Sequence, residues 1–174
     1  MNSLQVRNLS ELPGSRARLL SSGLLQSLVF FLKLFPRDTE LALNISRILS
    51  KLTLCDDVCS HLLDYRRDEE GPEEDGEDQL FTSLFSVLTT HVQKADLVVR
   101  VLFILGNLTA KNDEARARLW ELKRKETKRG PSLDTAPVKI LVTTFLTYVD
   151  MMSSELKGGE GPNKVEDVLI KLVR

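Results

Sequence analysis

The sequence of 174 residues predicts an all-α fold, a solenoid built from stacked three-helix repeats. Three observations lead to this prediction. The sequence matches itself in a single register at an offset of 56 positions. Apolar residues recur at the three- and four-residue spacing that gives an amphipathic helix its apolar stripe. No stretch alternates apolar and polar residues with the period of two that is typical of a half-buried strand, so no sheet is expected.

The internal repeat keeps its offset of 56 across two separate stretches. Residues 24–32 match 80–88, and residues 41–53 match 97–109. The matched positions of the longer stretch carry Leu41, Ile45, Ile48, Leu49, Leu52 and Thr53 in one copy, and Leu97, Val101, Ile104, Leu105, Leu108 and Thr109 in the other. A single copy cannot bury its apolar face, whereas stacked copies bury a continuous core. We therefore expect one repeat region over 1–174, with complete repeats at 24–65 and 80–123.

An acidic segment at residues 66–79 makes the first repeat unusually long. It contains no apolar residue apart from one proline and two glycines. A segment with this charge repels itself and buries nothing, so we expect a disordered acidic loop. Subtracting its 14 residues from the offset of 56 leaves 42, which lies within the range of known helical repeats.

Each repeat is expected to contain one short helix followed by two longer ones. Pro36 ends the first long helix, and Asp38 offers an acidic start for the next. A polar break then precedes a short helix expected at 58–65, and a similar break precedes the one expected at 114–123. His91 replaces the aromatic residue found at the equivalent positions of the other copies, so we expect it to pack in the core.

A third, looser copy follows the two complete repeats. Residues 141–148 match 84–91 at an offset of 57, and the final residues 167–172 match 96–101 at an offset of 71. The increase in offset between the two stretches indicates an insertion. The extra residues fit the glycine-rich sequence between them.

The remaining segments complete the expected organisation. Residues 1–23 resemble the end of a preceding repeat, residues 124–137 are expected to form a basic linker, and residues 138–174 are a partial repeat with a loop at 153–163. The last apolar residues carry no polar cap, so we expect a fragment or shortened form that is poorly soluble alone.

The end of the second complete repeat resembles the armadillo repeat, whose third helix closes on a similar step. Here the step is Asn107-Leu108-Thr109, preceded by Asp96 and Leu105. The similarity covers nearly the whole chain outside its two loops. It implies a right-handed armadillo-type solenoid that acts as a non-catalytic protein-interaction scaffold or adaptor.

Three blocks, at residues 45–53, 94–121 and 166–172, are similar to one member of this family that is associated with assembly of motile cilia and sperm flagella. This resemblance implies a protein of the cytoplasm and of the ciliary or flagellar axoneme. It also implies axonemal or intraflagellar-transport cargo as the protein partner.

The third helices would line the binding groove of such a solenoid. Armadillo proteins that hold extended peptides present a ladder of asparagines there, each with a tryptophan four residues earlier. This chain keeps the asparagine in two repeats of three and the tryptophan in none. The candidate groove residues are Asn44, Arg47, Lys51, Arg100, Phe103, Asn107 and Lys111. Their four cations favour an acidic segment of a protein partner. The alternative interpretation is that they are merely solvated residues of amphipathic helices.

Two further hypotheses use the same charges. A nucleic-acid-binding α-solenoid would combine the basic groove with the basic run at 123–129, although the net charge of −1 provides no overall attraction for nucleic acid. Alternatively, the acidic loop at 66–79 folds over the groove and competes with a partner.

The sequence carries no sign of catalysis, a cofactor or a metal. It has two histidines and no set of nucleophile, base and orienting residue, so neither enzyme activity nor a small-molecule substrate is expected. Cys55 and Cys59 lack the second pair of ligands that a structural zinc site needs, so we expect buried or half-buried thiols. The longest uncharged run, 19–32, is too short to span a bilayer, so no membrane is expected, and two cysteines indicate a reducing cytoplasm.

Overall fold

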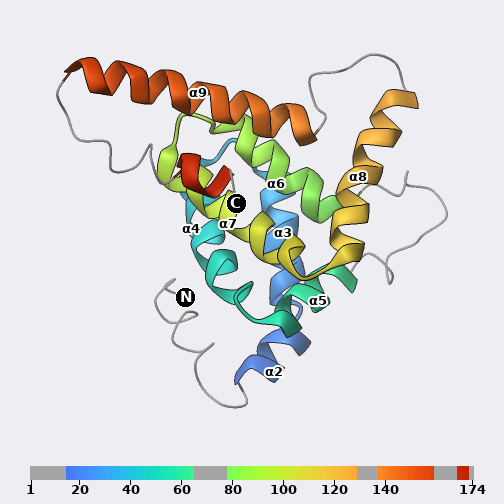
Figure 1. Cartoon of the computed structure of the whole chain (residues 1–174). Coiled ribbons are helices and arrows are strands. Elements are labelled where there is room, and N and C mark those ends of the chain that lie inside the picture. The colour runs from blue at the N-terminus through green and yellow to red at the C-terminus, as the bar shows by residue number, and fades with distance from the viewer. Residues whose placement is uncertain (1–14, 65–77, 129–136, 159–167, 173–174) are drawn as a thin grey trace.

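The computed structural model describes residues 15–64, 78–128, 137–158 and 168–172 (Figure 1). Every element within these ranges is a helix, and no strand occurs among them. The prediction of an all-α fold is therefore confirmed. The segments 1–14, 65–77, 129–136 and 159–167 lie outside the description, and with them most of the expected acidic loop.

The helices fall into three consecutive sets. The first set is α2 (Ser15–Ser21), α3 (Leu24–Leu34) and α4 (Thr39–Leu52), and the second is α5 (Asp56–Asp64), α6 (Gln79–Thr90) and α7 (Ala95–Ala110). The third set is α8 (Asp113–Lys128), α9 (Pro137–Gly158) and the helical residues 168–172. The first two sets have the predicted order of one short and two longer helices.

Equivalent helices of successive sets pack side by side. The second helices form one layer, in which α3 packs on α6 and α6 packs on α9. The third helices form another layer, in which α4 packs along α7 and residues 168–172 lie next to α7 (Figure 1). Because each set contacts mainly its neighbours, α2 and α9 lie at opposite ends of the molecule (Figure 1). This arrangement is the solenoid that the internal repeat predicted.

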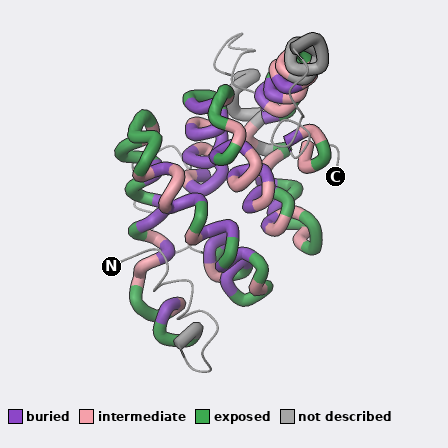
Figure 2. The backbone as a smooth tube through the Cα atoms, turned by 90° about the vertical axis from the view of Figure 1, so that its left-hand side faces the viewer, coloured by how far each residue is buried: buried purple, intermediate pink, exposed green. Residues whose placement is uncertain are grey.

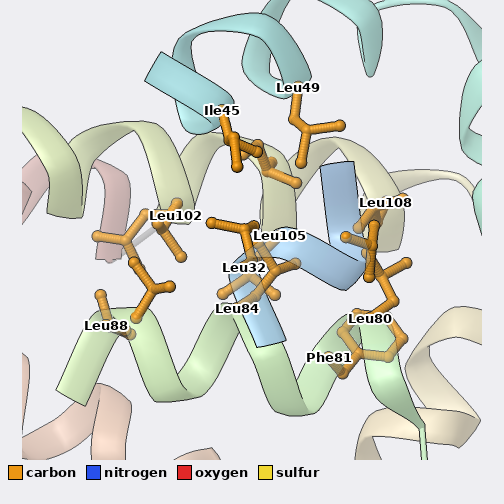
Figure 3. Close-up of a cluster of buried hydrophobic side chains, with 14 of the residues drawn as sticks. Leu32, Ile45, Leu49, Leu80, Phe81, Leu84, Leu88, Leu102, Leu105 and Leu108 are labelled. Atoms are coloured by element: carbon orange, nitrogen blue, oxygen red, sulfur yellow. The ribbon is translucent and has the colours of Figure 1, made fainter. Parts of the chain in front are cut away.

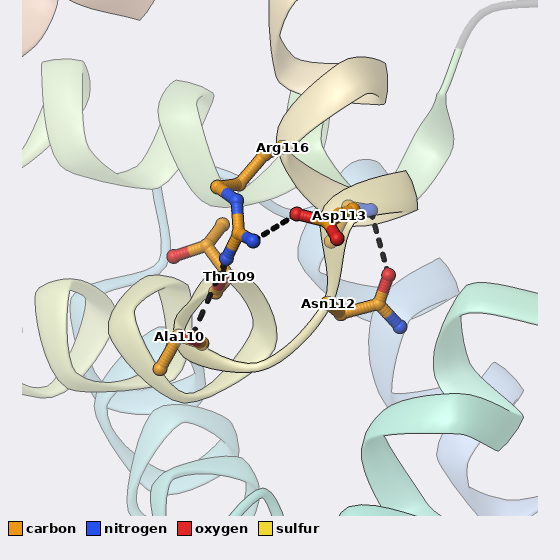
Figure 4. Close-up of polar contacts among 6 residues, drawn as sticks. Thr109, Ala110, Asn112, Asp113 and Arg116 are labelled. Carbon is orange, nitrogen blue, oxygen red and sulfur yellow. Dashed lines mark hydrogen bonds and ion pairs between the residues drawn. The ribbon is translucent and has the colours of Figure 1, made fainter.

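The helices α4 and α8 each begin at a side chain that accepts a hydrogen bond from one of their first amide groups. Asp38 accepts a hydrogen bond from the amide of Leu41 at 3.0 Å and so caps α4, as predicted. Asn112 accepts from the amide of Ala115 at 2.9 Å and caps α8, while Arg116 donates to carbonyl oxygens at the end of α7 (Figure 4). The polar break expected before α8 is therefore a turn stabilised by its own side chains.

The core is built from repeat-equivalent leucines. Leu49 of α4 and Leu105 of α7, which are matched at the offset of 56, are both buried where these helices meet (Figure 3). Leu32 of α3 and Leu88 of α6 occupy the same position in the second-helix layer and are each 1% exposed. Burying a leucine fully contributes about 1.5–3 kcal/mol, so these shared positions hold the stack together. Figure 2 shows the buried residues on the inner faces of the helices and the exposed residues outside.

Three boundaries differ from the predictions. The helix α8 continues to Lys128 rather than ending at 123, and α9 continues to Gly158, so residues 153–158 are helical rather than part of a loop. Neither stretch contains proline or glycine before the observed helix end, and lysine, arginine and glutamate favour helix. At the end of the expected acidic loop, Asp78 is 3% exposed and caps α6 through a 3.3 Å bond from the Phe81 amide.

Candidate protein-interaction surface

The predicted groove residues lie along the two packed third helices, α4 and α7. Their spacing of three, four and seven residues places each set on one side of its helix. We call these seven residues the third-helix surface: Asn44, Arg47, Lys51, Arg100, Phe103, Asn107 and Lys111. Asn8, the other asparagine of the expected ladder, lies outside the described residues.

Two arginines, Arg47 of α4 and Arg100 of α7, lie on neighbouring helices of this surface and repel each other electrostatically. Arg47 is exposed, and its Nη1 donates to Oδ1 of Asn44 at 3.3 Å. Arg100 is half-buried, and its Nε is buried without a hydrogen-bond partner. Burial lowers the pKa of Arg100, the positive charge of Arg47 lowers it further, and Asp96 acts in the opposite direction. An anion bound beside Arg100 would act in the same direction as Asp96 and favour the charged guanidinium.

Two lysines extend the positive charge along the surface. Lys51 is exposed on α4. Lys111, just after α7, lies 3.5 Å from Asp56, and the two side chains are 79% and 76% exposed. Exposed ion pairs contribute about 0–1 kcal/mol, so Lys111 can exchange Asp56 for a carboxylate of a partner at little cost.

Asn107, the described asparagine of the expected ladder, makes a contact between repeats. Its Nδ2 donates to Oγ1 of Thr53 at 3.1 Å, and Thr53 ends the preceding third helix. The Thr53 carbonyl in turn accepts from Sγ of Cys59 at 3.1 Å. One amide donor of Asn107 is therefore used in the stack of repeats, so it is not available to clamp a peptide backbone.

Phe103 is covered by a cation from the third repeat. The Nζ atom of Lys171 lies 4.7 Å from the centre of its ring, a favourable cation–π distance. Lys171 matches Arg100 at the offset of 71, and Phe103 matches Arg47 at the offset of 56. Each repeat therefore places a cation next to the same position of the preceding repeat. That position holds an aromatic ring in one step and a second arginine in the other.

Lys171 could have been predicted as a surface residue from the internal repeat, although not from its residue type alone. At the offset of 71 it aligns with the groove residue Arg100, yet it was not among the candidates. The described surface therefore has one more cation than predicted, contributed by residues 168–172.

A buried ion pair away from this surface was also missed. Nε of Arg118 lies 2.6 Å from Oδ2 of Asp78, with side chains 7% and 4% exposed. Nη1 of Arg118 donates to the carbonyl of Leu63 at 2.5 Å, and its guanidinium lies 5.7 Å from the centre of the Phe81 ring. Leu63 and Asp78 stand on either side of segment 65–77, so Arg118 joins the two ends of this insertion. The signal was an arginine at an apolar position of α8, between Ala115 and Leu122.

The two cysteines and His91 are buried or half-buried and contribute to packing. Cys59 is buried, and burial, followed by the negative charge of Asp56, raises the pKa of its thiol to about 11. Cys55 is half-buried, as expected. His91 is buried, and its Nε2 donates to the carbonyl of Pro36 at 2.8 Å. Within the described ranges, no three histidine, cysteine, aspartate or glutamate residues gather as metal ligands would. None of the described helices is long and apolar enough to cross a membrane.

Comparison with known proteins finds relatives that are similar to nearly the whole chain. No protein-family profile matches the chain, and no solved structure matches it. Armadillo repeat-containing protein 2 of Bos taurus is 34% identical over 178 residues, and that of Homo sapiens is 32% identical over 179; each alignment covers 97% of this chain. The chain is similar to these armadillo-repeat proteins along nearly its whole length. It is an armadillo-type α-solenoid, as the resemblance implied, and it spans about 18% of the length of these relatives.

Proposed function

We propose that this chain is a non-catalytic interaction scaffold whose third-helix surface binds an acidic segment of a protein partner. The proposal rests on one observation above all: the charge of Arg47 acts on Arg100 of the neighbouring helix, and Nε of Arg100 is buried without a hydrogen-bond partner. Similarity to armadillo-repeat proteins supports protein partners in general.

The chemistry of the pair favours a carboxylate. A guanidinium presents five donors in a planar fork that matches the two oxygens of a carboxylate. A carboxylate between Arg47 and Arg100 would offset the repulsion between two like charges and supply acceptors for both. Lys51 and Lys111 follow the pair toward the C-terminal ends of α4 and α7, so an extended acidic segment finds further cations in that direction.

A binding measurement with a defined peptide tests this proposal. A fluorescently labelled peptide rich in glutamate and aspartate is titrated with the wild-type chain and with Arg47→Glu/Arg100→Glu. We expect the double variant to bind at least about tenfold more weakly, since about 1.4 kcal/mol corresponds to a factor of ten. The matched control is Lys33→Glu/Arg37→Glu, which makes the same change in net charge at two exposed positions beside α3.

The control decides between a specific site and a general electrostatic effect. We expect the control variant to bind the peptide within a factor of about two of the wild type at physiological salt, because exposed charges beyond about 8 Å are largely screened. Equal losses in the two variants would contradict the proposed surface. Tighter binding of single-stranded RNA than of the peptide, with a steep dependence on salt, would favour the nucleic-acid alternative instead.

The expected role in assembly of motile cilia and sperm flagella belongs to this proposal and rests on the resemblance of three sequence blocks. On that basis the partner would be axonemal or intraflagellar-transport cargo. A fluorescently tagged chain expressed in multiciliated cells is expected in the cytoplasm and along the cilium, and Arg47→Glu/Arg100→Glu is expected to lose the ciliary signal at equal expression. A signal confined to the cell body for both proteins would contradict the ciliary role.

A further inference from the structure

The charges of the third-helix surface change sign along the helix axes. Both third helices carry an exposed carboxylate in their first turn, Glu40 in α4 and Asp96 in α7. Each lies four residues before the first surface residue of its helix, Asn44 or Arg100, so it continues the same face toward the N-terminal end. The cations of the surface follow in the middle and at the C-terminal end of each helix.

An acidic residue recurs at this position in three repeats. Glu40 matches Asp96 at the offset of 56, and Asp96 matches Asp167 at the offset of 71. Asp167 lies outside the described residues. A carboxylate in the first turn stabilises its own helix through the helix dipole, whatever binds there. For a partner, its effect is that the N-terminal side of the surface is negative while the remainder is positive.

The cations are spread along the helices rather than across the stack. Lys111 follows Arg100 by 11 residues, which corresponds to about 16 Å at the rise of an α-helix. Lys51 lies one turn beyond Arg47 on α4. The axes of packed helices are only about 8–10 Å apart, so a segment that crosses α4 and α7 passes a single turn of each. A segment that runs along the two helices reaches all four cations.

We propose that the partner segment lies along α4 and α7 and carries two blocks of charge, acidic residues against the cations and basic residues against Glu40 and Asp96. This inference rests on the proposed function, because the same surface binds the acidic block. Because the surface lies where α4 packs along α7, further stacked repeats would extend it rather than cover it.

Charge complementarity over the length of the surface favours this occupant. Asp96 and Lys111 are separated by about 22 Å of helix, a length that about seven residues of extended chain can span. A wholly acidic segment of this length would place its last carboxylates beside Glu40 and Asp96, where like charges repel each other. A segment with a basic block at that end meets the opposite charge throughout.

Two labelled peptides distinguish this arrangement from binding to the cations alone. The mixed peptide has four acidic residues, two glycines and two lysines, and the wholly acidic peptide has glutamates in place of the lysines. At low ionic strength, where exposed charges are least screened, we expect Glu40→Gln/Asp96→Asn to bind the mixed peptide about two- to fivefold more weakly. We expect the same variant to bind the wholly acidic peptide about two- to fivefold more tightly, because a repulsion is removed.

The opposite signs are the decisive feature, because both peptides are negative overall. A general effect of net charge would move the two affinities in the same direction. The matched control is Asp64→Asn/Asp150→Asn, which makes the same change in net charge at exposed positions of α5 and α9. We expect this control to change both affinities in one direction and by less than about twofold. Circular dichroism checks that each variant keeps its helical content.

Photo-crosslinking from the peptide provides a second measurement on the wild-type chain. A photoreactive group at the acidic end of the mixed peptide is expected to label the segments around Lys51 and Lys111. The same group at the lysine end is expected to label the segments around Glu40 and Asp96. Peptide mapping by mass spectrometry identifies the labelled segments, and labelling of the same turns from both ends would overturn the proposed orientation.

The binding results also separate this inference from the proposed function. If Glu40→Gln/Asp96→Asn changes the affinities for both peptides in the same direction, the two-block arrangement is wrong. If Arg47→Glu/Arg100→Glu weakens both peptides in that case, the acidic partner stands and only its arrangement fails. If that variant weakens neither peptide, the proposed function and this inference fail together.

Discussion

The buried pair of Arg118 and Asp78 should be among the most sensitive points of the fold. Replacing Arg118 by Met removes the 2.6 Å ion pair and the 2.5 Å bond to the Leu63 carbonyl. The carboxylate of Asp78 then stays buried, with the amide of Phe81 as its remaining donor among the contacts described above. Breaking a buried pair by removing one partner costs about 3–5 kcal/mol, mainly because the other charge is left uncompensated.

The loss of stability in each variant depends on which buried groups remain without a partner. Asp78→Asn keeps an oxygen that can accept from the Phe81 amide, so it retains the helix cap, but it leaves the charge of Arg118 buried and uncompensated, and about 3–5 kcal/mol is again expected. The double variant leaves no unpaired charge. Its cost should therefore fall below the sum of the two single costs by about 0.5–3 kcal/mol. A protein of this kind has a total stability of about 5–15 kcal/mol, so Arg118→Met removes a large fraction of it.

Urea unfolding followed by circular dichroism at 222 nm measures these free energies. The matched control is Arg116→Met in the same helix, because Arg116 and its partner Asp113 have side chains 50% and 95% exposed and such a pair contributes about 0–1 kcal/mol. Equal costs for Arg116→Met and Arg118→Met, or strict additivity of the two single variants of the buried pair, would refute the reasoning.

Four further predictions concern polar groups that the fold buries wholly or in part. Burial raises the pKa of Cys59 to about 11 and that of Tyr148 to about 12, from ordinary values of 9.0 and 10.0. The folded chain therefore retains protons that the unfolded chain releases. Stability, measured by urea unfolding, should be constant below pH 9 and fall as the pH rises towards 12. The hydroxyl of Tyr148 is buried without a hydrogen-bond partner, so Tyr148→Phe should unfold at equal or higher urea concentration and lose less stability at alkaline pH; a clear loss of stability at pH 7 would contradict this. A maleimide should label Cys55 in the native chain and Cys59 only after unfolding, which peptide mapping can show; equal native rates would contradict the burial of Cys59. Asn107→Ala should cost about 1 kcal/mol through its lost bond to Thr53, against a smaller cost for Asn44→Ala.

The sequence predicted those parts of the fold that depend on local patterns. The apolar stripes gave the helices of the two complete repeats, and the match at one offset predicted that Leu49 and Leu105 would occupy equivalent buried positions. Pro36 and Asp38 marked the break between α3 and α4, because a proline ends a helix and an aspartate caps the next one.

Features that depend on contacts between distant segments were not predictable in the same way. Asp78 stands at the end of an acidic run, and nothing local distinguishes it from its neighbours until Arg118, 40 positions later, is brought beside it. The inter-repeat bond of Asn107 to Thr53 likewise depends on how two third helices pack. The run of charges after residue 123 favours a linker by its charge alone, yet α8 continues to Lys128, because lysine and arginine are good helix formers.

Photo-crosslinking at defined positions tests the central claim most directly, because it reports which face a partner occupies. A photoreactive amino acid is placed at Lys51 on the third-helix surface or, as a control, at the exposed Lys33 of α3, and the chain is expressed in ciliated cells. The account predicts a crosslinked protein partner from position 51, lost in the Arg47→Glu/Arg100→Glu background, and none from position 33. Crosslinking of the same partner from position 33 alone, or equally from both positions, would contradict it.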